Sequence, residues 1–194
     1  LSLHDALPIS ITRILMCNLA FANLCMAVFL LMIISADMYS LGEYQNFAMR
    51  WQFGTGCKIA GFVSIFSTEL SVFVLTIITV ERYFTIVHPL KVNKHLNTKQ
   101  VIILIGVGWT FSLTMAILPL VGVSSYQQVA ICLPFDVKNT LSKVYVTFLL
   151  STNGMAFFFV LFCYGRMYCS LGGSVPGACV DRVERSEEHT SELQ

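Results

Sequence analysis

The chain has 194 residues, of which 56% are hydrophobic and 12% are charged, and its mean hydropathy is +0.72. This balance excludes an ordinary soluble domain, in which about a quarter of the residues are charged. The formal net charge of +1 is too small to indicate a nucleic-acid partner. The composition therefore indicates an integral membrane protein that is surrounded by membrane lipid.

Both ends of the chain read as translated sequencing adapters. Residues 1–9 have the sequence LSLHDALPI and residues 185–194 the sequence RSEEHTSELQ, and adapter oligonucleotides can encode each of them. We treat both as artefacts and exclude them, as expression tags are excluded. This removes Asp5 and a net charge of −2 at the other end, so the net charge rises from +1 to +4. Residues 172–184 have no assignment, and residues 10–171 form the expected domain.

Residues 14–38 form the first predicted membrane span. No charged residue lies between Arg13 and Asp37, and an apolar run of about 20 residues is long enough to cross the hydrocarbon layer as a helix. The span includes the segment NLAFAN, which ends at Asn23. Because an amide costs less to bury than a carboxylate, we expect Asn23 to be a hydrogen-bonding strut; the alternative is an ion ligand.

Residues 58–87 form the second predicted span, and Glu69 is the one ionisable side chain between Lys58 and Glu81. A carboxyl group inside a membrane indicates a functional site, provided that it faces other helices and finds a partner. The alternative is a structural role, in which a protonated glutamic acid bonds to a neighbouring backbone carbonyl. The pattern does not separate these two interpretations.

Two more spans are predicted over 101–121 and 144–168. The first of these carries no charge and has Pro119 near one end, where a kink or a stop is tolerated. The second has Arg166 near its end. Together with the two earlier runs they predict an all-α fold, a polytopic transmembrane helix bundle with four spans.

The charges of the loops predict the orientation of the bundle. Residues 82–100 carry four basic and no acidic side chains, whereas the connection between the first two spans mixes both signs. The positive-inside rule therefore places residues 82–100 and the start of the domain in the cytoplasm.

The second span carries the motif with the most specific spacing. Cys57 precedes Arg82 by 25 residues, and Arg82 lies in an ERY tripeptide that is followed by TIVHPL. At about 1.5 Å per residue this separation is about 37 Å, so the two residues lie at opposite membrane faces. The arrangement resembles the third transmembrane helix of rhodopsin-like G-protein-coupled receptors.

The other spans are similar to further helices of that family. NLAFAN resembles the NLAxAD motif of the second helix, Trp109 and Pro119 have the spacing of the fourth, and Tyr164 resembles a tyrosine of the fifth. Most members have a proline eight residues before that tyrosine, where this chain has Ala156. The resemblance implies a fragment of a seven-helix receptor, equivalent to helices two to five, with no enzymatic activity and no cofactor.

The resemblance also implies a G-protein face at the inner end of the second span. The residues assigned to it are Glu81, Arg82, Tyr83, Pro89 and Leu90. Glu81 would hold Arg82 in the resting state, and release of the arginine would favour the active state. For Pro89 and Leu90 the alternative is a helix-ending proline followed by a buried leucine.

A second set of residues is assigned to activation and to the helix core: Asn23, Glu69, Ser71, Trp109 and Tyr164. In the family, the position of Asn23 is an aspartate of a sodium pocket, and Ser71 matches its serine partner. The amide of Asn23 cannot neutralise a cation, which argues against a sodium site here.

Cys57 and Cys132 are the two cysteines that the predicted topology places clearly outside the cell. Because that compartment is oxidising, we expect a disulfide bond between them. The other five cysteines form no CxxC pair and show no metal-ligand spacing with the histidines. Most of them are expected to be small buried hydrophobic residues.

Three longer segments point to one type of receptor within this family. Over about residues 11–171 the chain resembles leucine-rich-repeat-containing receptors of the glycoprotein-hormone type. The resemblance rests on Ala156 and on the segments MCNLAFANLCM, STELSVFVLT and LPLVGVSSYQQVAICLPFD. STELSV and FCYGRMY are also similar to relaxin-type receptors, which remain an alternative. The resemblance implies a plasma-membrane receptor that binds an extracellular cystine-knot hormone, activates a heterotrimeric G protein and raises cyclic AMP. A transporter is the competing class, although internal repeats typical of transporters are not seen.

Overall fold

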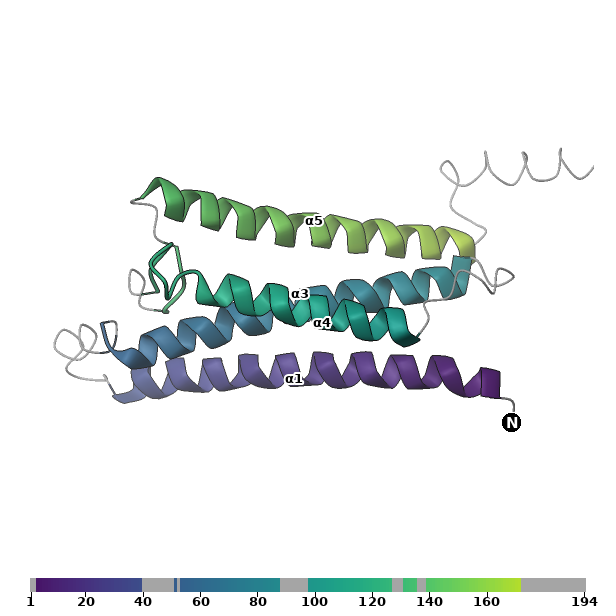
Figure 1. The fold of residues 1–194 in the computed structure, drawn as a ribbon, viewed down its shortest axis with the longest axis horizontal. Coiled ribbons are helices and arrows are strands. Elements are labelled where there is room, and N and C mark those ends of the chain that lie inside the picture. Colours follow the sequence, from purple (N-terminus) through teal and green to yellow (C-terminus); the bar gives the residue numbers. More distant parts are fainter. Residues whose placement is uncertain are drawn as a thin grey trace, which may run out of the picture.

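The computed structural model describes residues 3–39, 51, 53–87, 98–126, 131–135 and 139–171. Four long helices make up most of this part of the chain: α1 (Leu3–Tyr39), α3 (Thr55–Val87), α4 (Thr98–Ile117) and α5 (Thr140–Leu171). Figure 1 shows them lying side by side with their long axes in roughly the same direction. All four are long and apolar enough to cross a membrane. The prediction of an all-α bundle with four spans is confirmed.

Helix α3 is the centre of the bundle. It packs against α1, α4 and α5, and Figure 1 shows it running behind α4, between α1 and α5. In its most apolar stretch 56% of the residues are buried, compared with 11% in α1 and 17% in α5. Leu70 and Val74 are completely enclosed. The helix that carries the most specific motifs is therefore the helix that holds the others together.

The outer faces of α1 and α5 remain apolar and exposed. They present Leu24 and Leu31 on α1, and Met155 and Phe158 on α5. In water such faces would have to be buried against another layer of protein, but in a bilayer the lipid chains cover them. The exposed residues thus agree with a bundle that lies in a membrane.

The helices differ from the predicted spans chiefly at their ends. Helix α1 begins at Leu3, ahead of the predicted start at residue 14, although its apolar membrane span is Ile11–Tyr39. Helix α4 ends at Ile117, before the predicted end at residue 121. Pro119 explains the second difference, because proline has no N–H to donate and its ring obstructs the preceding turn.

Because α4 ends early, two of its backbone carbonyl groups have no hydrogen-bond donor within the helix, and two tyrosine hydroxyls donate to them instead. In a continuous helix the Met115 carbonyl would accept a hydrogen bond from the residue at position 119. Instead, the hydroxyl of Tyr145 on α5 donates to Met115 O at 2.9 Å. The hydroxyl of Tyr126 donates to the next carbonyl, Ala116 O, at 2.8 Å. The end of α4 is therefore tied to the loop that follows it and to α5.

Candidate functional site

A disulfide joins the beginning of α3 to the loop between α4 and α5. Cys57 and Cys132 have a Cα–Cα distance of 5.2 Å and are 75 residues apart in the chain. Both are fully buried. The structure thus contains the predicted disulfide.

The disulfide lies in a tightly packed region. One turn after Cys57, a Cβ atom added at Gly61 would collide with the Tyr126 ring and with the carbonyl oxygen of Cys132, so only glycine allows this approach. Burial raises the pKa of the Tyr126 phenol, and the neighbouring Tyr145 adds to the shift. Tyr126 therefore keeps its proton and donates to Ala116. This end of the bundle is held by a covalent bond, close packing and a buried hydrogen bond.

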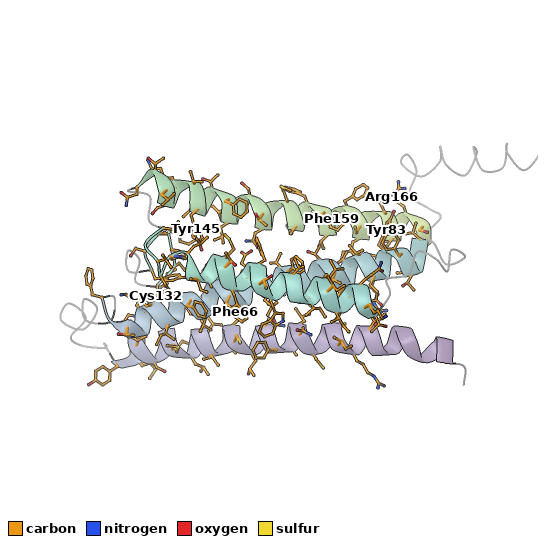
Figure 2. All side chains as sticks on the ribbon, in the orientation of Figure 1. Phe66, Tyr83, Cys132, Tyr145, Phe159 and Arg166 are labelled. Atoms are coloured by element: carbon orange, nitrogen blue, oxygen red, sulfur yellow. A yellow bond between two sulfur atoms is a disulfide. The ribbon has the colours of Figure 1, made fainter. Side chains whose placement is uncertain are left out.

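The ERY tripeptide lies at the opposite end of the bundle. Figure 2 shows Cys132 near one end and Tyr83 and Arg166 near the other. The side chain of Arg82 is exposed, and Tyr83 is partly buried, with its ring edge-on to Phe84 at a centroid distance of 5.7 Å. The long α3 helix thus separates the disulfide from the arginine, as the spacing in the sequence predicts. Pro89 and Leu90 lie outside the described residues.

Glu81 has a different partner from the one expected. Its Oε1 atom accepts a hydrogen bond from the Thr12 hydroxyl on α1 at 3.2 Å, and within the described residues no ion pair joins it to Arg82. Consecutive residues on a helix point in directions about 100° apart and do not face each other, so the two side chains diverge. The other carboxyl oxygen, Oε2, is buried without a hydrogen-bond partner in the described part of the chain. The contact that restrains this glutamate is therefore between helices.

Glu69 meets a polar partner on another helix. Its side chain is 3% exposed, and its Oε1 atom accepts a hydrogen bond from Nδ2 of Asn153 on α5 at 2.6 Å. The same amide nitrogen donates to Leu149 O at 2.9 Å. The partner is thus a side chain of a distant helix and not a neighbouring backbone carbonyl. Sequence reasoning missed Asn153, although an amide in the middle of an apolar span also needs a partner.

Trp109 joins three helices. Its indole Nε1 donates to Oδ1 of Asn18 on α1 at 3.1 Å, and the Asn18 amide donates to Ile14 O at 2.9 Å. The indole ring stacks on Phe21 of α1 at 5.4 Å and meets the edge of Phe66 of α3 at 5.5 Å. Asn18 opens the NLAFAN motif, but its pairing with Trp109 could not be read from the sequence.

Asn23 and Ser71 lie close together, as the resemblance implies. The Ser71 hydroxyl donates to Oδ1 of Asn23 at 3.4 Å, and Asn23 is exposed. No group of three or more metal-ligating side chains occurs in the described segments. The pair is a hydrogen-bonded contact between α1 and α3.

Tyr164 makes no hydrogen bond to the other candidate residues in the described part of the chain. It lies on α5, and its side chain is about half exposed. It takes part in no hydrogen bond with the described side chains of Glu81, Arg82 or Tyr83. Hydrogen bonds connect the other candidates in separate contacts: Thr12–Glu81 beside Arg82, and the pairs Asn23–Ser71, Glu69–Asn153 and Asn18–Trp109.

Comparisons with known proteins agree with this architecture. The family described as "7 transmembrane receptor (rhodopsin family)" matches residues 6–178. Squid rhodopsin superimposes with a TM-score of 0.66 at 20% identity, over 94% of this chain and 46% of that structure. The chain belongs to the rhodopsin family of seven-transmembrane receptors and is a multi-pass protein of the plasma membrane.

Curated relatives confirm the narrower resemblance to glycoprotein-hormone receptors. The lutropin-choriogonadotropic hormone receptor of Mus musculus is 48% identical over 160 residues, which are 82% of this chain and 23% of that protein. The follicle-stimulating hormone receptor of Felis catus is 43% identical over 84% of this chain and 24% of its own length. A probable glycoprotein hormone G-protein coupled receptor of Anthopleura elegantissima is 44% identical over 88% of this chain and 19% of its own length. The chain thus spans about a quarter or less of these relatives.

Proposed function

We propose that the chain forms part of the membrane domain of a hormone receptor that transmits the binding of an extracellular glycoprotein hormone to a heterotrimeric G protein and raises cyclic AMP. The role is signalling and involves no catalytic step. The glycoprotein-hormone receptors among its relatives favour this type over the relaxin type.

One observation carries the proposal: α3 presents a disulfide at one end and an exposed arginine at the other. The disulfide fixes the beginning of α3 to the loop after α4, so a force applied to that loop acts directly on the central helix. Arg82 is exposed at the far end of the same helix, where it is free to bind another protein. A shift of α3 would therefore move the disulfide and the arginine together.

We assign the remaining candidates to two roles. Arg82, Tyr83, Pro89 and Leu90 make the G-protein face, with Glu81 as the residue that restrains it through Thr12. Asn23, Ser71, Glu69, Trp109 and Tyr164 belong to the helix core that changes between the resting and active states. The hydrogen bonds of Asn23, Ser71, Glu69 and Trp109 support this role, because each of these side chains is bonded to a residue on another helix.

A chimeric receptor tests the proposal. Residues 10–171 replace the equivalent segment of the mouse lutropin-choriogonadotropic hormone receptor, and hormone-stimulated cyclic AMP is measured relative to surface expression. We expect a hormone-dependent rise in cyclic AMP that Arg82→Ala abolishes. A chimera that reaches the surface and binds hormone, but gives no rise or gives the same rise with Arg82→Ala, would refute the proposed function.

A further inference from the structure

Cys132 has an unusual backbone conformation for a residue that carries a side chain. Its φ angle is +57°, in the left-handed region, and Gly122 is the one other described residue with a positive φ. This region is unfavourable for any residue with a Cβ atom. A residue stays in it where the surrounding contacts hold it there. Contacts around Cys132 therefore fix the position from which it reaches Cys57.

Tyr126 contacts the surroundings of both cysteines. It precedes Cys132 by six residues and is 2% exposed. Its backbone carbonyl oxygen lies 3.4 Å from Cys57 Sγ. Its ring and the Cys132 carbonyl oxygen both approach α3 at Gly61, where an added Cβ atom would collide with each of them. One bare position on α3 thus receives the tyrosine ring and the backbone of the cysteine together.

Hydrogen bonds to backbone carbonyl groups hold this arrangement from two further sides. The Tyr126 hydroxyl donates to Ala116 O near the end of α4 at 2.8 Å. The hydroxyl of Ser124, which is also buried, donates to Pro134 O at 3.1 Å. The segment that carries Cys132 is therefore bonded back to the segment that carries Tyr126. All these contacts require α3, the end of α4 and the loop to be packed together.

We propose that Tyr126 is the positioning residue of the Cys57–Cys132 bond. Packed on Gly61 and held by α4, it sets Cys132 in the conformation that brings the two thiols together, which raises the effective concentration of one at the other. When the bond forms, both thiols give up their protons and two electrons to a disulfide oxidant of the outer compartment, which becomes two thiols. The bond therefore closes only after α3, the end of α4 and the loop have assembled.

Equilibration with glutathione redox buffers tests the proposal on the purified receptor that contains this chain. Free thiols are trapped with N-ethylmaleimide, and peptide mapping by mass spectrometry gives the fraction with the bond and hence the effective concentration of the two thiols. We expect Tyr126→Ala and Gly61→Ala each to lower that concentration several-fold. Tyr126→Phe keeps the ring and loses the bond to α4, so it should give an intermediate value. It takes the place of the alanine variant if that variant does not fold.

Gly108→Ala is the matched control, because it also drives a Cβ atom into an aromatic ring, that of Phe73, at a point on α3 that is 16 residues beyond Cys57. Tyr145→Phe is a second control, which removes the neighbouring hydroxyl bond to α4. Both should lower the melting temperature and leave the effective concentration unchanged.

None of these measurements uses a hormone or a G protein, so their outcome is independent of the proposed function. The proposal is overturned if the variants of Tyr126 and Gly61 keep the effective concentration of the unmodified receptor. It is equally overturned if Gly108→Ala or Tyr145→Phe lowers that concentration as much as they do.

Discussion

The amide of Asn153 on α5 donates a hydrogen bond to the buried carboxyl group of Glu69 on α3, with an Nδ2–Oε1 distance of 2.6 Å. This bond joins two residues 84 positions apart. It is a polar link between the central helix and α5. A buried polar group that loses its partner is destabilising, so the bond makes the pairing of these two helices specific.

We predict that Asn153→Leu lowers the free energy of unfolding by about 1–2 kcal/mol, because Glu69 is left without its partner. Glu69→Leu combined with Asn153→Leu should cost less than the sum of the single substitutions. The melting temperature of the purified receptor, followed with a thiol-reactive dye, measures the effect. Thr152→Val is the control, since that hydroxyl bonds only within α5. Additive losses in the double variant would show that the two residues are not coupled.

We predict that Tyr145→Phe destabilises the receptor by about 1 kcal/mol, because the Met115 carbonyl then has no donor. Combining it with Pro119→Ala should recover part of this loss, since an alanine at position 119 has the N–H group that proline lacks. Thermal melting of the two single variants and the double variant is the measurement. If Pro119→Ala gives no recovery, the tyrosine does not replace the missing backbone donor.

We predict that Thr12→Val raises basal cyclic AMP several-fold, because it removes the hydrogen bond by which α1 restrains Glu81. The bond contributes about 1 kcal/mol, which is enough to change the population of a minor active state by that factor. Basal cyclic AMP relative to surface expression is the readout. Thr85→Val is a matched control, because its hydroxyl donates to the Glu81 backbone carbonyl and not to the side chain. Equal basal signals from the two variants would exclude the restraint.

We predict that Arg82→Ala abolishes hormone-stimulated cyclic AMP and that Leu90→Ala reduces it, both with nearly unchanged hormone binding. The reason is that both residues are assigned to the proposed G-protein face, and Arg82 lies at the end of α3 opposite the disulfide. Parallel hormone-binding and cyclic AMP assays on intact cells separate the two effects. Normal signalling from both variants would show that this end of α3 does not contact the G protein.

We predict that a cysteine introduced at Thr98 is protected from a membrane-impermeant thiol reagent in intact cells, whereas one introduced at Gln127 is labelled. The expectation follows from the basic residues within residues 82–100 and the absence of acidic ones there. Permeabilised cells provide the control, in which both sites should react. Labelling at Thr98 with protection at Gln127 would reverse the proposed orientation.

Residues singled out in the sequence differ in how far their contacts could be foreseen. The Cys57–Cys132 bond was predictable because topology and compartment leave few partners for an extracellular cysteine. Glu69 was predictable as a buried carboxyl group that needs a partner, but Asn153 was not, because it comes from a distant helix. For Glu81 the sequence favoured its neighbour Arg82, whereas the structure pairs it with Thr12. Adjacency in sequence places the two side chains on different faces of one helix.

The sequence by itself determined the four apolar spans that the structure describes in this chain, and which of them carries the cysteine and the arginine at its two ends. The length of an apolar run and the spacing of charges along one helix are local properties, and they need no knowledge of neighbouring helices. Only the tertiary structure decided which side chains meet. Spans that are apolar on all sides show little periodicity, so their rotation about their own axes cannot be read from the pattern of residues. The packing of α1, α4 and α5 around α3 sets that rotation, and with it the contacts of Glu69, Glu81 and Trp109.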